Sequence, residues 1–281
     1  MTLPKKIFGL IGDPVSHSLS PLMHNAAFAH LKIDAEYKLF PLKEQELQGF
    51  LRGLGKSDIC GLNVTVPYKE KVIPLLANIS EEARLIGAVN TIKVSNDRLD
   101  GFNTDGLGFL RHLKQELDFD PRGKSIAVIG AGGASRAVCV YLSKEGAAKI
   151  SIFDIDKPKA QGLARHLKEN FPSTEVLTVD SAQGLGLSDC ALLVNASPIG
   201  MKESDPSVIK DEDIGNDLLV YDLVYNPAET KLLKAAKEKG ARSVNGLGML
   251  LHQGAAAFEI WTQEKAPLDV MRKALMEGVG K

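Results

Sequence analysis

The feature that most constrains the fold is a glycine-rich turn that joins an apolar strand to a helix. The run Gly130-Ala131-Gly132-Gly133-Ala134 directly follows the apolar residues 126–129. Gly130 permits a tight turn, and Gly132 lets the backbone approach a pyrophosphate at the positive end of the helix. Ser135 stands where the third glycine of this fingerprint usually lies, so the motif is a variant. We expect this run to bind a dinucleotide.

A second apolar strand supports this interpretation. Lys149–Phe153 is predicted to lie in the same sheet, and Asp154 follows it about 24 residues after Gly130. In dinucleotide-binding folds an acid at this place binds the ribose hydroxyls of the adenosine. The alternative for Asp154 is a solvated residue at a strand end. A later apolar strand, Ala191–Val194, leads into Asn195, and strand ends of this kind line the ligand crevice of such sheets.

Strand-like and helix-like segments alternate along the whole chain, which predicts an α/β fold with largely parallel sheets. A length of 281 residues suits two domains. From residue 125 to about residue 244 we expect strands and helices to alternate regularly. The other predicted strands are Ile7–Ile11, Ala35–Leu39, Cys60–Val66, Val89–Val94 and Arg98–Asn103, the last two flanking a hairpin turn at Asn96-Asp97, and the predicted helices are Pro21–Leu31, Lys43–Leu54, Tyr68–Leu76, Glu81–Ile86, Asp105–Leu117, Leu247–Thr262 and Leu268–Glu277.

Composition excludes several classes of function. A net charge of −1 provides no basic field for phosphates, so we expect no binding to nucleic acid. No stretch reaches the roughly 20 apolar residues of a membrane helix, so we expect no membrane span. Cys60, Cys139 and Cys190 are far apart, which favours buried free thiols and a reducing cytoplasm over disulfides or zinc. The six histidines lack metal-ligand spacing, so we assign no metal.

Polar residues beside apolar segments form three candidate binding clusters. In the first, Ser18 and Ser20 lie where a helix is expected to begin, with Ser20 as the N-cap and Pro21 as the first helical residue. Two hydroxyls at a helix N-terminus suit a carboxylate ligand. The alternative interpretation is simple helix capping.

The second cluster lies on the strand predicted at residues 60–66. Asn63 and Thr65 are two residues apart and therefore share one face, whereas Val64 and Val66 face the other way. Lys69 follows immediately, on the turn into a helix. A lone lysine there is usually solvated, but beside polar strand residues that point the same way it becomes a candidate acid or base.

The third cluster combines Asn90, at the start of a predicted strand, with Asp105, at the start of a predicted helix. Asp105 could cap that helix, contribute to a site, or do both. Asn90 lies in the run Gly87-Ala-Val-Asn90-Thr91, and Asp105 lies in the run Gly101-Phe-Asn103-Thr104-Asp105-Gly106. These clusters indicate a polar binding site outside the dinucleotide half.

Taken together, eight short motifs resemble the shikimate dehydrogenase family, and they occur in the family's order along nearly the whole chain. As a set they are highly specific, although each alone is not. They are Ser18-x-Ser20-Pro, Asn63-Val-Thr-Val-Pro-Tyr-Lys69, Ala88-Val-Asn90-Thr, Asn103-Thr-Asp105-Gly, Gly130-Ala-Gly-Gly-Ala-Ser-Arg136, Asn195-Ala-Ser-Pro-Ile-Gly-Met201, Tyr221-Asp-Leu-Val-Tyr225-Asn-Pro and Gly246-Leu-Gly-Met249-Leu-Leu-His-Gln253.

The resemblance implies a substrate domain, residues 1–105 with 246–281, and a Rossmann-like NAD(P)-binding domain, residues 106–245, with a cleft between them. The C-terminal helices would fold back onto the substrate domain. The implied activity is the reversible NAD(P)-dependent reduction of 3-dehydroshikimate to shikimate, in the pathway to chorismate and the aromatic amino acids. The implied protein is a cytoplasmic monomer or homodimer.

The resemblance also implies roles for individual residues. Lys69 and Asp105 would form the catalytic pair, and Ser18 and Ser20 would hold the substrate carboxylate with Tyr225 nearby. The residues implied to bind the ring hydroxyls are Asn63, Thr65, Asn90, Asp105 and Gln253, and those implied to lie at the nicotinamide end of the cofactor are Leu223 and Gly246.

The chain departs from the family pattern at the adenosine end. Members that use NADP commonly carry an Asn-Arg-Thr-type segment after the second strand of the dinucleotide half, whereas this chain has Asp154-Ile155-Asp156. No arginine is available there for a 2′-phosphate, although Lys157 and Lys159 lie close by. We therefore predict that NAD is preferred over NADP.

Two other functions remain open on the sequence. The first is an NAD-dependent quinate/shikimate dehydrogenase, which Asp154 favours, although quinate-preferring members often carry Thr where Ser20 stands. The second is a dinucleotide-binding protein without catalysis. The presence of both Lys69 and Asp105 argues against it.

Overall fold

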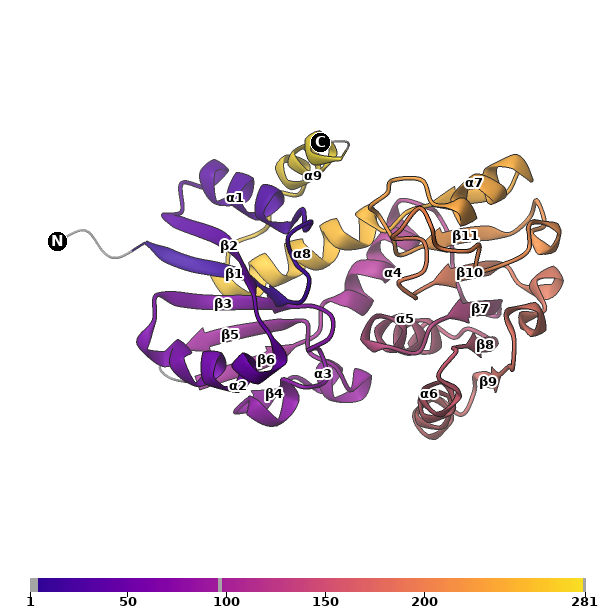
Figure 1. The fold of residues 1–281 in the computed structure, drawn as a ribbon, viewed down its shortest axis with the longest axis horizontal. Coiled ribbons are helices and arrows are strands. Elements are labelled where there is room, and N and C mark those ends of the chain that lie inside the picture. The colour runs from indigo at the N-terminus through magenta and orange to yellow at the C-terminus, as the bar shows by residue number, and fades with distance from the viewer. Residues whose placement is uncertain (1–4, 96–97, 280–281) are drawn as a thin grey trace. The chain divides into compact units, whose positions relative to one another are not determined.

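The computed structural model describes residues 5–95 and 98–279, and the chain divides into two compact units. Unit 1 comprises Met1–Gly108 and Leu250–Lys281, and unit 2 comprises Phe109–Met249. The division falls inside two helices, α4 (Asp105–Gln115) and α8 (Leu247–Thr262). Each unit is a six-stranded sheet with helices packed against it, which confirms the predicted α/β class (Figure 1).

The sheet of unit 1 has the strand order β2-β1-β3-β5-β6-β4. Strands β1, β2 and β3 are parallel, whereas β5 runs antiparallel to both β3 and β6. The sheet is therefore mixed, and the prediction of largely parallel sheets holds better for unit 2. The elements are β1 (Lys6–Gly12), α1 (Ser20–His30), β2 (Ala35–Pro41), α2 (Glu44–Gly53), β3 (Ile59–Val64), β4 (Asn78–Ile79), α3 (Glu81–Ile86), β5 (Thr91–Ser95), β6 (Arg98–Phe102) and α9 (Leu268–Gly278).

Strand register explains which side chains face which helices in unit 1. Paired residues of parallel strands point to the same face, and β1 pairs Phe8 with Tyr37 and Leu10 with Asn63. This face is covered by α1, α8 and α9, whose apolar residues form one core with Phe8 and Leu10. The C-terminal helices thus pack on unit 1, as predicted (Figure 1). Ile11 and Leu62 face a second core on the other side.

One close contact fixes α8 on this face. The indole of Trp261 lies directly over Gly61, so that a side chain at position 61 would collide with it. The indole Nε1 donates a 3.0 Å hydrogen bond to the carbonyl of Ile92 on β5. A buried tryptophan needs such a partner for its N–H group, and here the partner is the sheet itself.

Unit 2 is a parallel sheet with the strand order β12-β11-β10-β7-β8-β9. Residues 127 and 129 of β7 face the core that contains α7, and residues 126 and 128 face the opposite side, where α5 packs against β7 and α6 against β8 (Figure 1). The elements are β7 (Ser125–Ile129), α5 (Gly133–Lys144), β8 (Lys149–Phe153), α6 (Lys157–Asn170), β9 (Glu175–Thr178), β10 (Leu192–Asn195), β11 (Leu219–Asp222), α7 (Lys231–Glu238) and β12 (Arg242–Val244).

Two predictions of secondary structure are wrong. The helix expected at Tyr68–Leu76 is a series of turns with one short 3₁₀ segment, Ile73–Leu75. Pro74 lacks the N–H group that would continue a helix, and Tyr68 and Val72 are instead fully buried in the core against the sheet. The regular alternation expected across residues 125–244 also fails, because 3₁₀ turns and loops replace helices between β9 and β11. The predicted turn at Asn96-Asp97 lies outside the described residues.

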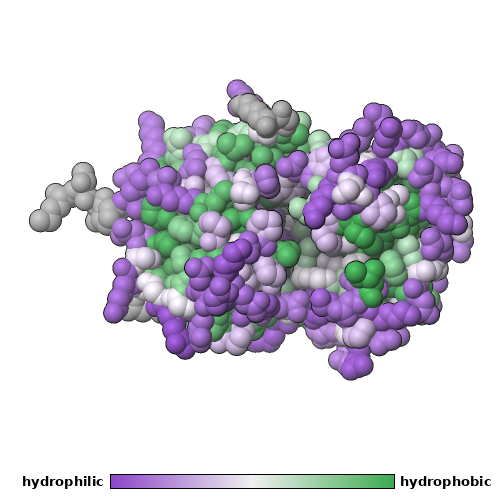
Figure 2. Space-filling view, viewed as in Figure 1, coloured by the Kyte–Doolittle hydropathy of each residue, from purple (hydrophilic) through white to green (hydrophobic). Residues whose placement is uncertain are grey.

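The surface and the cysteines add three observations. Hydrophilic residues cover much of the face drawn in Figure 2, and apolar residues show between them in patches. No helix within residues 5–95 and 98–279 is long and apolar enough to cross a membrane. Cys139 is fully buried, and burial raises the pKa of its thiol to about 12, whereas Cys60 and Cys190 are only half-buried, contrary to prediction.

Candidate active site

Lys69 and Asp105 form the central ion pair of unit 1. The Nζ of Lys69 donates to Oδ2 of Asp105 at 2.6 Å, and the two side chains are 14% and 6% exposed. Asp105 is the first residue of α4 rather than its N-cap. The backbone N–H of Asp105 donates to the side-chain oxygen of Asn103, which holds the start of the helix. The structure therefore brings together a cation and an anion from segments 36 residues apart.

Asn90 holds the carboxylate of Asp105 from its other side. The Nδ2 of Asn90 donates to Oδ1 of Asp105 at 2.8 Å and to Oγ1 of Thr104 at 2.9 Å, and it lies 3.2 Å from Oε1 of Gln253. Asn90 is 2% exposed. Lys69, Asp105, Asn90 and Gln253, all predicted site residues, thus lie in one hydrogen-bonded group.

Asn63 joins the same group from β3. Its Nδ2 donates to the carbonyl of Asn90 at 3.2 Å and to Oγ1 of Thr91 at 3.1 Å, because Asn63 and Thr91 are paired residues of β3 and β5. Its Oδ1 accepts a 2.8 Å hydrogen bond from the hydroxyl of Tyr37.

Sequence reasoning missed Tyr37, Thr91 and Thr104. A signal for the two threonines was available, because each directly follows an asparagine in the runs around Asn90 and Asp105, but an isolated tyrosine in a strand carried none.

Ser18 and Ser20 form a separate hydroxyl pair at the start of α1. The hydroxyl of Ser18 donates to that of Ser20 at 3.2 Å and also accepts from the backbone N–H of Ser20 at 3.2 Å. The prediction of Ser20 as N-cap is wrong, because the helix begins at Ser20 itself and Leu19 is the capping residue. Ser18 reaches the first-turn N–H instead, so the hydroxyl of Ser20 takes no part in capping.

Thr65 lies just beyond the end of β3. The strand was expected to continue to Val66 but ends at Val64, and Val66 is 67% exposed rather than facing the core. The backbone N–H of Thr65 still bonds the carbonyl of Ile11 on β1, which keeps the chain extended up to this residue. The segment then turns back, with the N–H of Tyr68 bonded to the carbonyl of Thr65, and this turn delivers Lys69 to Asp105.

In unit 2, the glycine-rich turn follows β7 as predicted. Gly130 has φ +103°, and a side chain there would approach the carbonyl oxygen of Ala196 to 2.8 Å, so glycine is required for two reasons. The hydroxyl of Ser135 donates to the carbonyl of Gly130 at 2.6 Å. This bond ties the first turn of α5 to the loop and explains why serine replaces the usual third glycine.

The start of α5 fits a pyrophosphate. Gly132 is its N-cap, with no side-chain cap among the described residues, so the first-turn N–H groups of the helix, at Gly133 and Ala134, remain directed outward. A side chain built at Gly132 would meet no atom within 4 Å, which leaves open space beside these donors. Free donors at the positive end of a helix are the usual anion site of dinucleotide-binding folds.

Asp154 is anchored at the end of β8 by two backbone N–H groups. Its Oδ2 accepts from Ala131 at 2.6 Å and its Oδ1 from Asp156 at 2.8 Å. Ile155, between the two acids, is 86% exposed. The nearby lysines are paired with carboxylates, Lys157 with Asp180 at 2.6 Å and Lys159 with Asp156 at 3.5 Å.

Leu223 and Gly246 are neighbours in unit 2, where a side chain at Gly246 would collide with the carbonyl of Leu223. The segment after β11 is held by Asp222, which is fully buried and accepts from Asn195, Thr230 and the N–H of Val224. Burial raises the pKa of Asp222. Tyr225 lies half-buried between β11 and α7.

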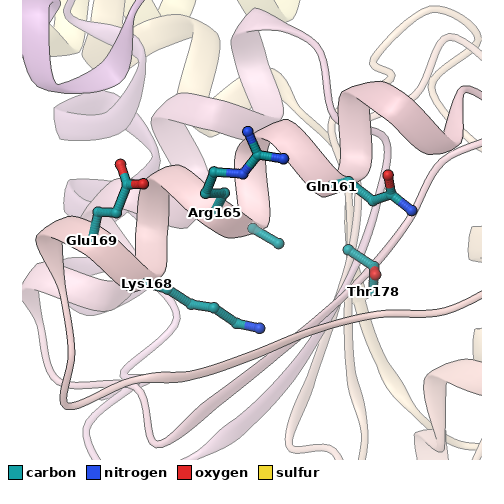
Figure 3. Close-up of a pocket in the computed structure, with 6 residues that line it drawn as sticks. Gln161, Arg165, Lys168, Glu169 and Thr178 are labelled. Atoms are coloured by element: carbon teal, nitrogen blue, oxygen red, sulfur yellow. The ribbon is translucent and has the colours of Figure 1, made fainter.

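Two pockets in unit 2 contain none of the predicted site residues. One, of about 420 Å³, lies between α6 and β9 and is lined by Gln161, Arg165, Lys168 and Thr178 among others (Figure 3). The other, of about 480 Å³, lies between the loop at residues 199–208 and the start of α7. Within the described ranges no three potential metal ligands gather into a group.

The chain matches two family models, the shikimate dehydrogenase substrate binding domain over residues 10–92 and the shikimate 5′-dehydrogenase C-terminal domain over residues 246–276. The shikimate dehydrogenase (NADP(+)) of Methanopyrus kandleri is 47% identical over 275 residues, which cover 96% of this chain and 95% of that protein.

Solved structures agree with these sequence matches. The crystal structure of shikimate dehydrogenase from Aquifex aeolicus is 41% identical, with a TM-score of 0.90, and covers 98% of this chain and 99% of that one. Shikimate 5-dehydrogenase from Listeria monocytogenes in complex with shikimate and NAD is 35% identical, with a TM-score of 0.87 over 96% of each chain. Similarity in sequence and fold thus extends over nearly the whole chain. The chain belongs to the shikimate dehydrogenase family, oxidoreductases that act on a CH–OH group.

Proposed function

We propose that this chain catalyses the reversible NAD(P)-dependent reduction of 3-dehydroshikimate to shikimate. The observation that carries the proposal is the nearly buried Lys69–Asp105 pair, whose carboxylate is fixed on its second oxygen by Asn90. A lysine held in this way by a single carboxylate has hydrogens left to donate to a substrate oxygen. Ion pairs that only solvate a protein surface are usually exposed, whereas this pair is nearly buried and its carboxylate has a second hydrogen-bond partner.

The chemistry needs a proton donor at the ketone oxygen. Reduction places negative charge on that oxygen as hydride, which the nicotinamide supplies, reaches the carbon. The ammonium of Lys69 stabilises this charge and delivers the proton. In the direction of oxidation, the neutral amine of Lys69 accepts the proton of the alcohol. Asp105 orients Nζ of Lys69 in both directions, since it accepts a 2.6 Å hydrogen bond from that atom.

We propose that the remaining residues hold the substrate so that its ketone oxygen lies beside Nζ of Lys69. We assign the carboxylate to the hydroxyls of Ser18 and Ser20, at the positive end of α1, with Tyr225 as a further contact. The proposed ring-hydroxyl contacts are Asn63, Thr65, Asn90, Asp105 and Gln253. Unit 1 is accordingly the proposed substrate domain and unit 2 the proposed dinucleotide domain, with Gly130–Ala134 at the pyrophosphate and Leu223 and Gly246 at the nicotinamide.

We further infer that NAD is preferred over NADP. The carboxylate of Asp154 is held in place by Ala131 and Asp156, with lone pairs left to accept from the ribose hydroxyls. A 2′-phosphate would put a second anion beside it. Lys157 and Lys159 form exposed ion pairs with Asp180 and Asp156, so each would have to leave a carboxylate partner to reach that phosphate. The Listeria monocytogenes relative, which was solved with NAD, shows that NAD binding occurs within the family.

A matrix of initial rates tests the proposed function. Shikimate and quinate are each assayed with NAD and with NADP, using the purified full chain. The proposal predicts the highest kcat/KM with shikimate and NAD. A higher value with quinate would instead support the quinate/shikimate dehydrogenase that Asp154 also favours, and no turnover of either substrate would contradict dehydrogenase activity altogether.

A further inference from the structure

We propose that Tyr37 is a positioning residue for substrate binding, because it holds Asn63 so that a carbonyl oxygen, and not an amide N–H, is presented to a substrate hydroxyl. The proposal rests on the proposed function of unit 1. Tyr37 lies on β2 and reaches across β1 to Asn63 on β3, with 2.8 Å between its hydroxyl and Oδ1. It is 2% exposed and belongs to none of the motifs that indicated the site.

The directions of the hydrogen bonds in this network follow from the orientation of the Asn90 amide. A backbone N–H can only donate, and that of Thr104 lies 2.8 Å from one terminal atom of the Asn90 amide, which must be oxygen. The other terminal atom lies 2.8 Å from the carboxylate of Asp105 and must be nitrogen. The orientation of this amide is therefore determined by its partners.

Thr91 then determines the orientation of the Asn63 amide. The hydroxyl of Thr91 uses its single hydrogen to donate to the Asn90 oxygen at 2.9 Å, so it can only accept from Asn63. The Asn63 atom beside it must be nitrogen, which also faces the carbonyl of Asn90. Oδ1 of Asn63 consequently faces Tyr37, whose hydroxyl donates.

This arrangement determines what Asn63 can still bind. Both hydrogens of its Nδ2 are committed, to Asn90 and to Thr91, and one lone pair of Oδ1 is committed to Tyr37. The one remaining capacity is the second lone pair of Oδ1. Asn63 can therefore accept a hydrogen bond from a substrate hydroxyl but cannot donate one, which selects for a hydroxyl over an ether or a keto oxygen at that ring position.

Tyr37 is itself rigidly held by α1. The side-chain amide of Asn25 accepts from the N–H of Tyr37 at 2.8 Å and donates to its carbonyl at 3.1 Å. The imidazole of His24 stacks on its ring, with centroids 4.4 Å apart and planes 5° from parallel. A residue clamped on its backbone and on its ring can transmit that rigidity to Asn63.

The test compares Tyr37→Phe with Tyr68→Phe. Tyr68 is also buried in unit 1, but its hydroxyl donates to the carbonyl of Leu42, outside the network, so this control matches the loss of a buried hydroxyl. The readouts are the Kd for shikimate by calorimetry, the steady-state constants and the thermal midpoint. We expect Tyr37→Phe to raise Kd and KM about tenfold and to leave kcat within about twofold, since Lys69 and Asp105 remain. Tyr68→Phe should leave Kd unchanged.

A double-mutant cycle separates positioning from general destabilisation. If Tyr37 acts through Asn63, adding Tyr37→Phe to Asn63→Ala should not raise Kd further, whereas a structural defect would add to it. An unchanged Kd in Tyr37→Phe, or additive effects in the cycle, would overturn the inference. Binding of shikimate without turnover in the wild type would refute only the proposed function, and absence of shikimate binding would refute both.

Discussion

The departure from the NADP pattern at Asp154-Ile155-Asp156 leads to a prediction of cofactor choice that can be reversed by design. The double variant Asp154→Asn with Ile155→Arg removes the anion beside the 2′ position and supplies a guanidinium next to it. Ile155 is 86% exposed, so an arginine fits there without repacking. Asp154→Asn has a structural cost, because both carboxylate oxygens accept backbone N–H groups and an amide offers only one oxygen.

The magnitude follows from the charges involved. Two like charges about 4 Å apart repel by roughly 1 kcal/mol in water and about 4 kcal/mol at an effective dielectric of 20. Asp154 is half-buried and lies between these limits, which corresponds to a preference of about fivefold to a thousandfold for NAD. The lost backbone hydrogen bond costs about 1–3 kcal/mol of stability. That cost is the same with either cofactor and cancels in the ratio.

The assay is kcat/KM for each cofactor at saturating shikimate, expressed as a ratio of NAD to NADP. We expect the ratio to exceed about five in the wild type and to fall by at least about fivefold in the double variant. Ile155→Gln is the matched control, because it adds a polar side chain without charge and should leave the ratio close to the wild-type value. A wild type that prefers NADP, or a double variant whose ratio does not change, would show that Asp154 does not determine the choice of cofactor.

Two further variants test other parts of the structure. Ser18→Ala with Ser20→Ala should raise KM for shikimate with little change in kcat, and a fall in thermal stability without any change in KM would mean that the serines only organise the helix start. Burial lowers the pKa of His24 to about 3. Below pH 6.5 the imidazole is therefore protonated in the unfolded chain but stays neutral in the folded chain, so acid favours unfolding. Between pH 6.5 and pH 5 the free energy of unfolding of the wild type, measured by denaturant titration, should thus fall by about 2 kcal/mol more than that of His24→Phe. If the two proteins lose the same stability over this pH range, the protonation of His24 is not the cause.

The sequence correctly predicted those helices and strands whose bounds depend on neighbouring residues alone. The strand at Lys149–Phe153 and the helix at Leu247–Thr262 have the predicted bounds, because each has a continuous apolar pattern with clear turn residues at its ends. The segment at Tyr68–Leu76 failed because a helix-like spacing of apolar residues there reflects burial against the sheet, while Pro74 interrupts the backbone hydrogen bonds. Such a distinction depends on tertiary contacts.

The candidate site shows the same limit. Lys69 and Asp105 were identified through motifs, and the structure adds the contacts that hold them. Tyr37 could not be found in this way, because its proposed role arises from the register of three strands, which places it on the same face of the sheet as Asn63 and within hydrogen-bond distance of it. No feature in the sequence of β2 or of β3 indicates the hydrogen bond between Tyr37 and Asn63. Sequence patterns thus predicted the candidate reactive groups but not the residues that contact and hold them.

We propose that Lys69 supplies the proton in a reaction organised by its contact with Asp105. The most direct measurement is kcat for Lys69→Ala with saturating shikimate and cofactor, next to Lys71→Ala, whose lysine pairs with Glu44 at the surface. We expect Lys69→Ala to lower kcat by about two to four orders of magnitude, the usual scale for loss of a general acid, with a much smaller change in KM. Lys71→Ala should match the wild type. A Lys69→Ala enzyme with near-wild-type kcat would show that Lys69 does not supply the proton.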